Sequence, residues 1–271
     1  MVFKMFKMLL KILSLWLKNA KMCIMSEFAY RTEFIVRCFI IFIGNLIAPL
    51  VALLIYKTTA GIPGWSFWEF ILFQGIFILI FNGLSNAFLW RIVSNVSRGV
   101  KKGTFDNTLI KPFNPLLFIT FTSFDFEHIG DILAGMFLII LALIKLKWEF
   151  SLLTLAPALL LVLGGILFLY SLHVITAALS FVFVQLENLV DLSLSFMEFG
   201  KYPLSIYGMS MRFLLTFIFP AGLAAFCPAS VLIGKEAWPI LLRVIPSVAG
   251  FFVLSLIIWS ALLKRYQSAG G

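Results

Sequence analysis

The sequence predicts an all-α, polytopic membrane protein with six transmembrane helices. Of its 271 residues, 62% are apolar and only 12% are charged, and the mean hydropathy is +1.08, whereas soluble domains are about 45 to 50% apolar and about 25% charged. Charge-free runs long enough to cross a bilayer recur along the chain, each span needing about 20 apolar residues. We therefore expect residues 26–271 to form a single transmembrane domain.

The first 25 residues have the periodicity of an amphipathic helix. Lysines recur every three or four positions with one serine between them, and large apolar residues fill the other side; the polar stripe is Lys4, Lys7, Lys11, Ser14, Lys18 and Lys21. This pattern predicts an interfacial helix over residues 1–25, lying on the cytoplasmic leaflet and bound to membrane lipids. The alternative is a solvated helix that packs on a soluble partner.

The first two spans follow where charge disappears, at Cys38–Tyr56 and Phe70–Trp90. Asn82 and Asn86 share a face of the second span, where interhelical hydrogen bonding or a substrate path would use them. Residues 91–115 come next and are strongly basic, with Asp106 as their one acid; the basic residues are Arg91, Arg98, Lys101, Lys102 and Lys111. Such an excess indicates a cytoplasmic segment.

The third span is expected at about Glu127–Leu146, with His128 and Asp131 near its cytoplasmic boundary. No charge occurs from Phe150 to Leu186, and one helix of that length would reach about 55 Å against a hydrocarbon core of about 30 Å. The chain must therefore turn back, and we place the turn near residues 177–180. The fourth span precedes this turn and the fifth, Phe181 to about Phe199, follows it.

Acidic residues on one face of the fifth span are candidates for a substrate path or a subunit interface. Glu187, Asp191, Ser195 and Glu198 recur at helical spacing, and acids within a membrane usually face a bundle interior or a wet cavity. Alternatively, Glu187 and Glu198 lie at the two membrane surfaces, which leaves Asp191 alone buried.

Residues 200–235 allow two topologies before the sixth span at about Pro239–Leu263. Phe213–Gly234 is apolar enough to cross but contains Pro220 and Pro228, which interrupt helices. It is either a re-entrant hairpin that dips in from outside or a full span. With the hairpin, 14 of the 21 Lys and Arg side chains lie inside, which favours cytoplasmic termini in the cell (plasma) membrane.

The sequence contains no recognisable nucleotide-binding, catalytic or metal-binding motif. The sequence has no phosphate-binding loop, no zinc-binding or serine-hydrolase motif, two isolated histidines (His128 and His173) and three scattered cysteines. We therefore expect no catalytic residues, metal or cofactor in this chain. The net charge of +9 is explained by basic segments beside anionic lipid rather than by a nucleic-acid partner.

Two sequence blocks resemble one family. Gly103-Thr104-Phe105-Asp106 through Leu109-Ile110-Lys111-Pro112-Phe113-Asn114-Pro115 resembles the "G-x-L-D-x-x-L-x-K-P-x-N-P" signature of ABC-2 type permeases, with Phe105 in place of leucine. Residues 199–207, with Phe217, Pro220 and Pro228, are similar to that family's "F-G-R-Y-P-x-x-I-Y" and "F-x-x-P … x-P-A" blocks, with Lys201 in place of arginine. Together with the pattern of spans, the resemblance covers residues 25 to 265.

The resemblance implies a coupling helix within residues 91–115 that docks on a separate ATPase, which would bind ATP and Mg. The candidate coupling residues are Arg98, Gly103, Asp106, Leu109, Ile110, Lys111 and Pro112. It also implies an extracellular re-entrant region at residues 200–235 with Tyr202, Pro203, Pro220 and Pro228, and so it favours the hairpin topology. The implied assembly has two ATPase subunits and a second permease, as a homodimer or heterodimer.

The sequence thus predicts the permease subunit of an ABC exporter, which is not itself an enzyme. Related systems export drugs, peptides, lipids or polysaccharides, so fold and family do not identify the cargo. The alternative is an ATP-independent membrane protein such as a lipid scramblase or secondary carrier. Secondary carriers often contain internal repeats with paired broken helices, and this chain has one broken segment and no repeat.

Overall fold

The computed structural model describes residues 30–122, 125–183, 197–218, 224–235 and 240–267, together with Ser14, residues 17–18 and 21–25, Phe28, Ser195 and Gly222. Every regular element in these residues is a helix, which confirms the all-α prediction. Most of the predicted interfacial helix lies outside the described residues, and its described positions at 14, 17–18 and 21–25 are helical.

Five helices among the described residues are long and apolar enough to cross a membrane: Arg31–Thr58, Phe67–Lys101, Phe126–Lys145, Leu152–Leu179 and Val244–Leu263. They match five of the six predicted spans. Most of the predicted fifth span, Phe181–Phe199, lies outside the described residues. The fourth span ends at Leu179, followed by turn hydrogen bonds such as Ser180 N to Ala177 O at 3.1 Å, where the sequence predicts the turn.

The second span is longer than expected. It comprises α3 (Phe67–Phe77), the π-helix η1 (Ile78–Ser85), α4 (Asn86–Phe88) and α5 (Trp90–Lys101). Its 35 residues extend about 50 Å, well beyond a hydrocarbon core of about 30 Å. The helix therefore continues past Trp90 and carries the basic residues of α5 out of the membrane.

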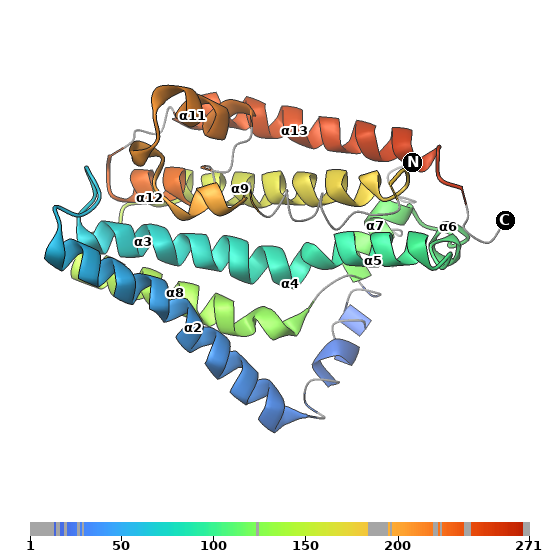
Figure 1. The fold of residues 1–271 in the computed structure, drawn as a ribbon, viewed down its shortest axis with the longest axis horizontal. Coiled ribbons are helices and arrows are strands. Elements are labelled where there is room, and N and C mark those ends of the chain that lie inside the picture. The colour runs from blue at the N-terminus through green and yellow to red at the C-terminus, as the bar shows by residue number, and fades with distance from the viewer. Residues whose placement is uncertain are drawn as a thin grey trace.

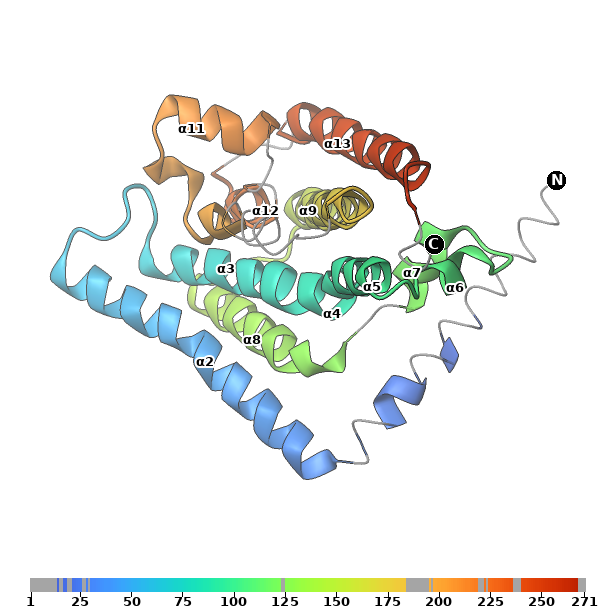
Figure 2. The same cartoon turned by 45° about the vertical axis from the view of Figure 1, so that its right-hand side comes forward.

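The spans lie side by side along the long axis of the molecule, with the second span in the middle (Figure 1). α8 (Ile129–Lys145) and α9 (Leu152–Leu179) cover it, and α13 (Ile240–Leu263) packs on α9. α2 (Arg31–Thr58) contacts α8 and then diverges from the bundle (Figure 2). The most apolar window of the second span is 67% buried, whereas that of α2 is 11% buried.

Glycines on α8 bring its neighbours close. An ideal Cβ at Gly135 would lie 2.6 Å from the backbone nitrogen of Leu79 in η1, and one at Gly130 would lie 2.5 Å from the carbonyl oxygen of Cys38 in α2. No side chain fits at either position, so glycine allows the backbones to approach, as small residues commonly do between membrane helices.

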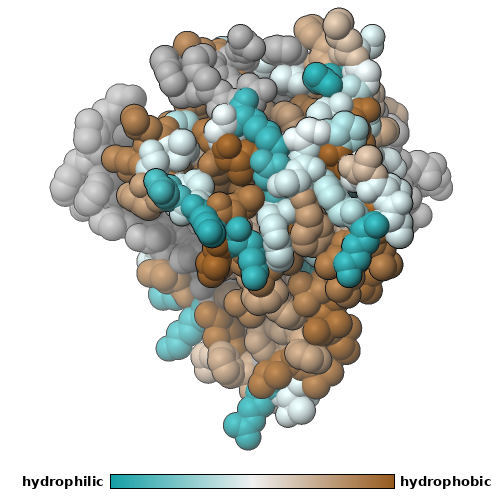
Figure 3. All heavy atoms as spheres, turned by 90° about the vertical axis from the view of Figure 1, so that its left-hand side faces the viewer, coloured by the Kyte–Doolittle hydropathy of each residue, from teal (hydrophilic) through white to brown (hydrophobic). Residues whose placement is uncertain are grey.

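The two ends of the bundle differ, and we name them by their short helices. The α6 end holds α6 (Asp106–Leu109), α7 (Pro115–Thr122) and the end of α13, whereas η2 (Phe126–His128) precedes α8 and contacts α4 and η1. The α11 end holds η3 (Phe199–Lys201), η4 (Leu204–Ile206), α11 (Met209–Phe213), the π-helix η5 (Leu214–Ile218) and α12 (Phe226–Leu232). Figure 3 looks onto the α11 end, where hydrophilic side chains gather and give way to hydrophobic ones below.

Phe213–Gly234 is not one continuous helix. η5 ends at Ile218 and α12 begins at Phe226, and Ala224 and Ala225 lie in a turn. The segment is fixed to the bundle: Lys235 Nζ donates to Glu69 Oε2 at 2.6 Å, and Trp148 Nε1 donates to Leu232 O at 3.0 Å. Both contacts hold α12 against the ends of neighbouring spans.

Candidate functional site

The segment after α5 reverses direction through a glycine turn. Gly103 has a φ of +68°, a backbone conformation that glycine adopts without steric cost. The turn is closed by hydrogen bonds from Gly103 N to Val100 O at 3.2 Å and from Phe105 N to Gly99 O at 3.1 Å. It places α6 at the tip of the α6 end, within the segment in which the sequence predicts a short helix.

Phe105 anchors α6 to two spans. Its side chain is 2% exposed, and its ring centroid lies 5.1 Å from that of Phe181, just after α9, and 5.3 Å from that of Tyr266, just after α13. Phe181 in turn packs on Trp259 of α13 at 5.1 Å. Sequence reasoning noted Phe105 only as a departure from leucine, because its burial depends on residues far along the chain.

Two apolar side chains at the end of α6 are exposed at a basic surface. Leu109 is 38% exposed and Ile110 is 80% exposed. Exposed basic side chains surround them in the sequence, namely Arg98, Lys101, Lys102 and Lys111. An exposed apolar tip on a short, anchored helix is the geometry that a partner's groove can hold.

The remaining coupling candidates have structural partners. Arg98 Nε donates to Ser94 O within α5 at 3.1 Å, Asp106 begins α6, and Lys111 Nζ lies 3.9 Å from the ring centroid of Phe118. Pro112 is exposed in the bend after α6.

The Asn114-Pro115 pair starts α7. The Asn114 Oδ1 accepts hydrogen bonds from Leu116 N at 3.0 Å and Leu117 N at 3.3 Å. Asparagine is a preferred helix N-cap, and proline is favoured at the first helical position because its missing N–H needs no partner there. The end of the family-like block therefore fixes where the chain re-enters a helix.

A chain of polar side chains links three helices near the centre of the bundle. Asn82 Nδ2 in η1 donates to Asn45 Oδ1 in α2 at 3.0 Å, and Asn45 Nδ2 donates to Asp131 Oδ1 in α8 at 2.7 Å. His128 Nδ1 lies 2.8 Å from Asp131 Oδ2. Asp131 is thus buried but hydrogen-bonded on both oxygens, and buried polar groups in membranes require such partners. Asn86 is half-buried in α4 without a side-chain hydrogen bond to other described residues.

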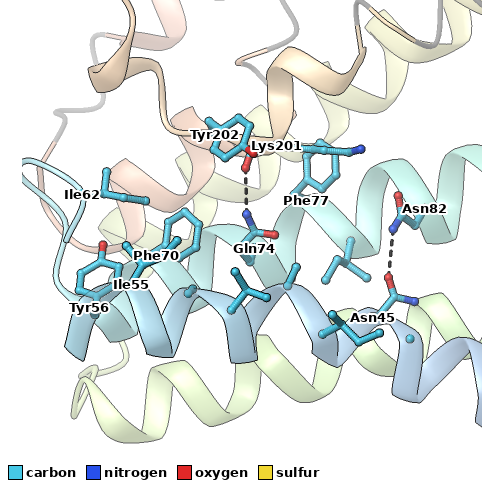
Figure 4. Close-up of a pocket in the computed structure, with 16 residues that line it drawn as sticks. Asn45, Ile55, Tyr56, Ile62, Phe70, Gln74, Phe77, Asn82, Lys201 and Tyr202 are labelled. Carbon is cyan, nitrogen blue, oxygen red and sulfur yellow. Dashed lines mark hydrogen bonds between the residues drawn. The ribbon is translucent and has the colours of Figure 1, made fainter. Parts of the chain in front are cut away.

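A cavity of about 530 Å³ lies between α2 and the α3–η1 helix (Figure 4). Its wall is mostly apolar, with the Asn45–Asn82 pair at one end and Gln74 in the middle; the lining residues are Gly44, Asn45, Ile47, Ala48, Val51, Ala52, Ile55, Tyr56, Ile62, Phe70, Gln74, Phe77, Ile78, Asn82, Lys201 and Tyr202. Sequence reasoning missed Asn45 and Gln74, although each is an isolated polar residue in an apolar span, which is a usable signal.

The re-entrant candidates lie at the α11 end. Tyr202 lines the cavity, and Pro203 and Pro228 are buried. The Tyr207 hydroxyl donates to Phe199 O at 3.0 Å, and burial raises the pKa of Tyr207. Pro220, Glu187 and Asp191 lie outside the described residues.

Comparison with known proteins gives one match. A protein-family model described as "ABC-2 family transporter protein" matches residues 39–270. These residues include most of the first described span, the other four spans, α6, the cavity and the α11 end. No curated protein and no solved structure shows a significant match. Because the family match covers most of the chain, the protein belongs to the ABC-2 family of transporter proteins.

Proposed function

We propose that this protein is the membrane-spanning permease subunit of an ABC exporter, driven by a separate ATPase that docks on α6. The observation that carries the proposal is the two-sided arrangement of α6: Ile110 points away from the bundle at 80% exposure, while Phe105 is 2% exposed among the ends of α9 and α13. Family membership supports it. ATP and Mg would bind to the ATPase, and the chain itself would perform no hydrolysis.

The α6 end would be cytoplasmic. It carries the basic residues of α5 and of the segments that follow α5, α6 and α13, namely Arg91, Arg98, Lys101, Lys102, Lys111, Lys264 and Arg265. Cytoplasmic segments of membrane proteins are enriched in Lys and Arg. Both termini would then lie inside, in the cell (plasma) membrane, and the α11 end would face outward.

The outer region would be a re-entrant hairpin rather than a full span. Short helical elements, α11 with η5 and α12, flank the turn at Ala224–Ala225, and Pro228 lies in α12. Irregular backbone at membrane depth is tolerated where protein covers it, and α12 packs on α9 and α3. Six spans, with residues 1–25 lying on the inner leaflet, complete this topology.

The working unit would contain two permeases and two ATPase subunits. α2 offers a large surface for lipid or for a second permease, identical or related, because its most apolar window is only 11% buried. No nucleic-acid partner is proposed.

Force would pass from the ATPase through α6 to the spans. A groove that grips Leu109 and Ile110 moves α6, and the Phe105 ring transmits this motion to Phe181 and Tyr266. α5 moves as well, because Phe105 N is hydrogen-bonded to Gly99 O. Packed elements with discrete arrangements transmit such shifts better than flexible loops.

The test is the double variant Leu109→Asp with Ile110→Asp in the full-length protein, co-expressed with an ABC ATPase that co-purifies with the unchanged protein. Co-purification of the ATPase and its substrate-stimulated ATP hydrolysis should both fall sharply, because two carboxylates would enter an apolar groove. Asn107→Asp is the matched control, since it adds a carboxylate at an exposed polar position of α6. Unchanged binding in a correctly inserted double variant would remove α6 from the interface.

A further inference from the structure

The cavity between α2 and the α3–η1 helix is lined by both apolar and polar side chains. Its long sides are aliphatic and aromatic, but three carboxamides line it, namely Asn45, Gln74 and Asn82 (Figure 4). Its volume of about 530 Å³ falls within the range of about 300 to 1,000 Å³ that is typical of small-molecule sites. Such a wall fits an apolar chain that carries one polar group.

The cavity is accessible from the side of α2. Among the described residues, Ile47, Val51 and Ile55 line it and are also exposed at 59%, 49% and 44%. Since α2 diverges from the bundle (Figures 1 and 2), a molecule dissolved in the bilayer reaches the cavity without crossing the protein.

The carboxamides specify which polar group is accepted. Gln74 Nε2 donates to Lys201 O at 2.8 Å, and Asn82 Nδ2 donates to Asn45 Oδ1 at 3.0 Å. These contacts fix both side chains through their nitrogen atoms. Within the part of the chain that the structure describes, neither Gln74 Oε1 nor Asn82 Oδ1 accepts a hydrogen bond. Both oxygens are acceptors, so they favour a ligand with an N–H or O–H over one with only ester oxygens.

We propose that this cavity binds the acyl chain of an N-acyl amphiphile taken from the bilayer, with the amide N–H donated to Gln74 or Asn82. The proposal deepens the proposed function, because it names the chemical class that the permease receives as cargo. Binding itself needs only this chain, so it is measured without an ATPase.

The experiment uses the full-length protein in nanodiscs of an ester phospholipid. The probes are a long-chain N-acyl amide with a diazirine in its chain and the ester analogue with the same chain. The amide should bind about tenfold more tightly than the ester, the factor that corresponds to one hydrogen bond in an apolar site. Its photo-cross-links should map to α2, α3 and η1.

Two glycine variants provide the matched pair. An ideal Cβ at Gly44 or at Gly250 meets nothing within 4 Å, so a leucine fits at either position, but only Gly44 lines the cavity. Gly44→Leu should reduce amide binding about tenfold or more, as expected when a side chain occupies a binding site. Gly250→Leu should leave it unchanged, and Asn82→Leu or Gln74→Leu should reduce the preference for amide over ester.

Equal affinity for amide and ester, cross-links elsewhere, or equal effects of the two glycine variants would each overturn the proposal. If Gly44→Leu instead disrupts self-association while amide and ester bind alike, the cavity is an interface between copies. The outcomes are separable from the coupling test: amide-selective binding with no ATPase docking on α6 would refute the exporter role and leave the cavity assignment intact.

Discussion

Replacing Phe105 with alanine should separate ATPase docking from force transmission. The ring is buried, and it makes aromatic pairs with Phe181 at 5.1 Å and Tyr266 at 5.3 Å. Truncating a buried phenylalanine to alanine costs about 3 to 5 kcal/mol. Phe105→Leu keeps most of the apolar volume and loses two ring pairs worth about 0.5 to 1.5 kcal/mol each.

The packing energy of the Phe105 ring is lost at the contact between α6 and the ends of α9 and α13. The exposed side chain of Ile110 is unchanged by the substitution. We therefore expect Phe105→Ala to retain ATPase co-purification but to lose most substrate-stimulated hydrolysis, and Phe105→Leu to lose less. The assay compares both readouts in reconstituted complexes, with Phe113→Ala, half-buried in the same segment, as the control. Full stimulation in Phe105→Ala would refute the transmission role; loss of binding as severe as in the Leu109→Asp, Ile110→Asp variant would show that Phe105 merely holds α6 folded.

Three further substitutions test the fold around these sites by thermal unfolding of the purified protein. Asp131→Leu should lower the free energy of unfolding by about 1 to 3 kcal/mol for each hydrogen-bonding partner left unpaired, and Asp131→Asn should lower it less. Equal destabilisation by the two substitutions would show that the hydrogen bonds of Asp131 do not stabilise the fold. Asn114→Ala should cost about 1 kcal/mol through the lost N-cap, and Asn114→Ser should recover most of it. Gly135→Leu should abolish stable folding, because its Cβ would lie 2.6 Å from a backbone atom, whereas Gly250→Leu should be tolerated.

Most of the span positions could be predicted because charge in a hydrocarbon core is costly. The uncharged stretch from Phe150 exceeds a bilayer crossing, so a turn near residue 180 follows from length alone, and the structure places the end of α9 at Leu179. The glycine turn at Gly103 and the helix start at Asn114-Pro115 are also local effects, which sequence patterns record.

The cavity and the polar chain could not be predicted, because they depend on how helices pair. Asn45 and Asn82 are 37 residues apart, and their contact requires α2 to lie beside η1. The π-helix η1 is itself invisible in the apolar pattern, since its wider turns change which side chains share a face. Such segments often occur at functional sites, and here one presents Asn82 to both the cavity and the polar chain.

The continuity of the second span connects the two candidate sites. Gln74 and Asn82, which line the cavity, lie on the same helix that ends at Lys101, immediately before the turn that holds α6. A displacement of α6 therefore moves the wall of the cavity as well as the ends of α9 and α13. The π-helix η1 lines the end of the cavity that is nearer to α5, and π-helical turns often occur at functional sites. A shift at η1 would alter the Asn82–Asn45 contact and with it the position of α2.

ATPase docking and amphiphile binding would then bias one and the same rearrangement, and coupling between binding sites must be reciprocal. Amphiphile bound in the cavity should accordingly strengthen docking at α6 by the same factor by which docking strengthens amphiphile binding.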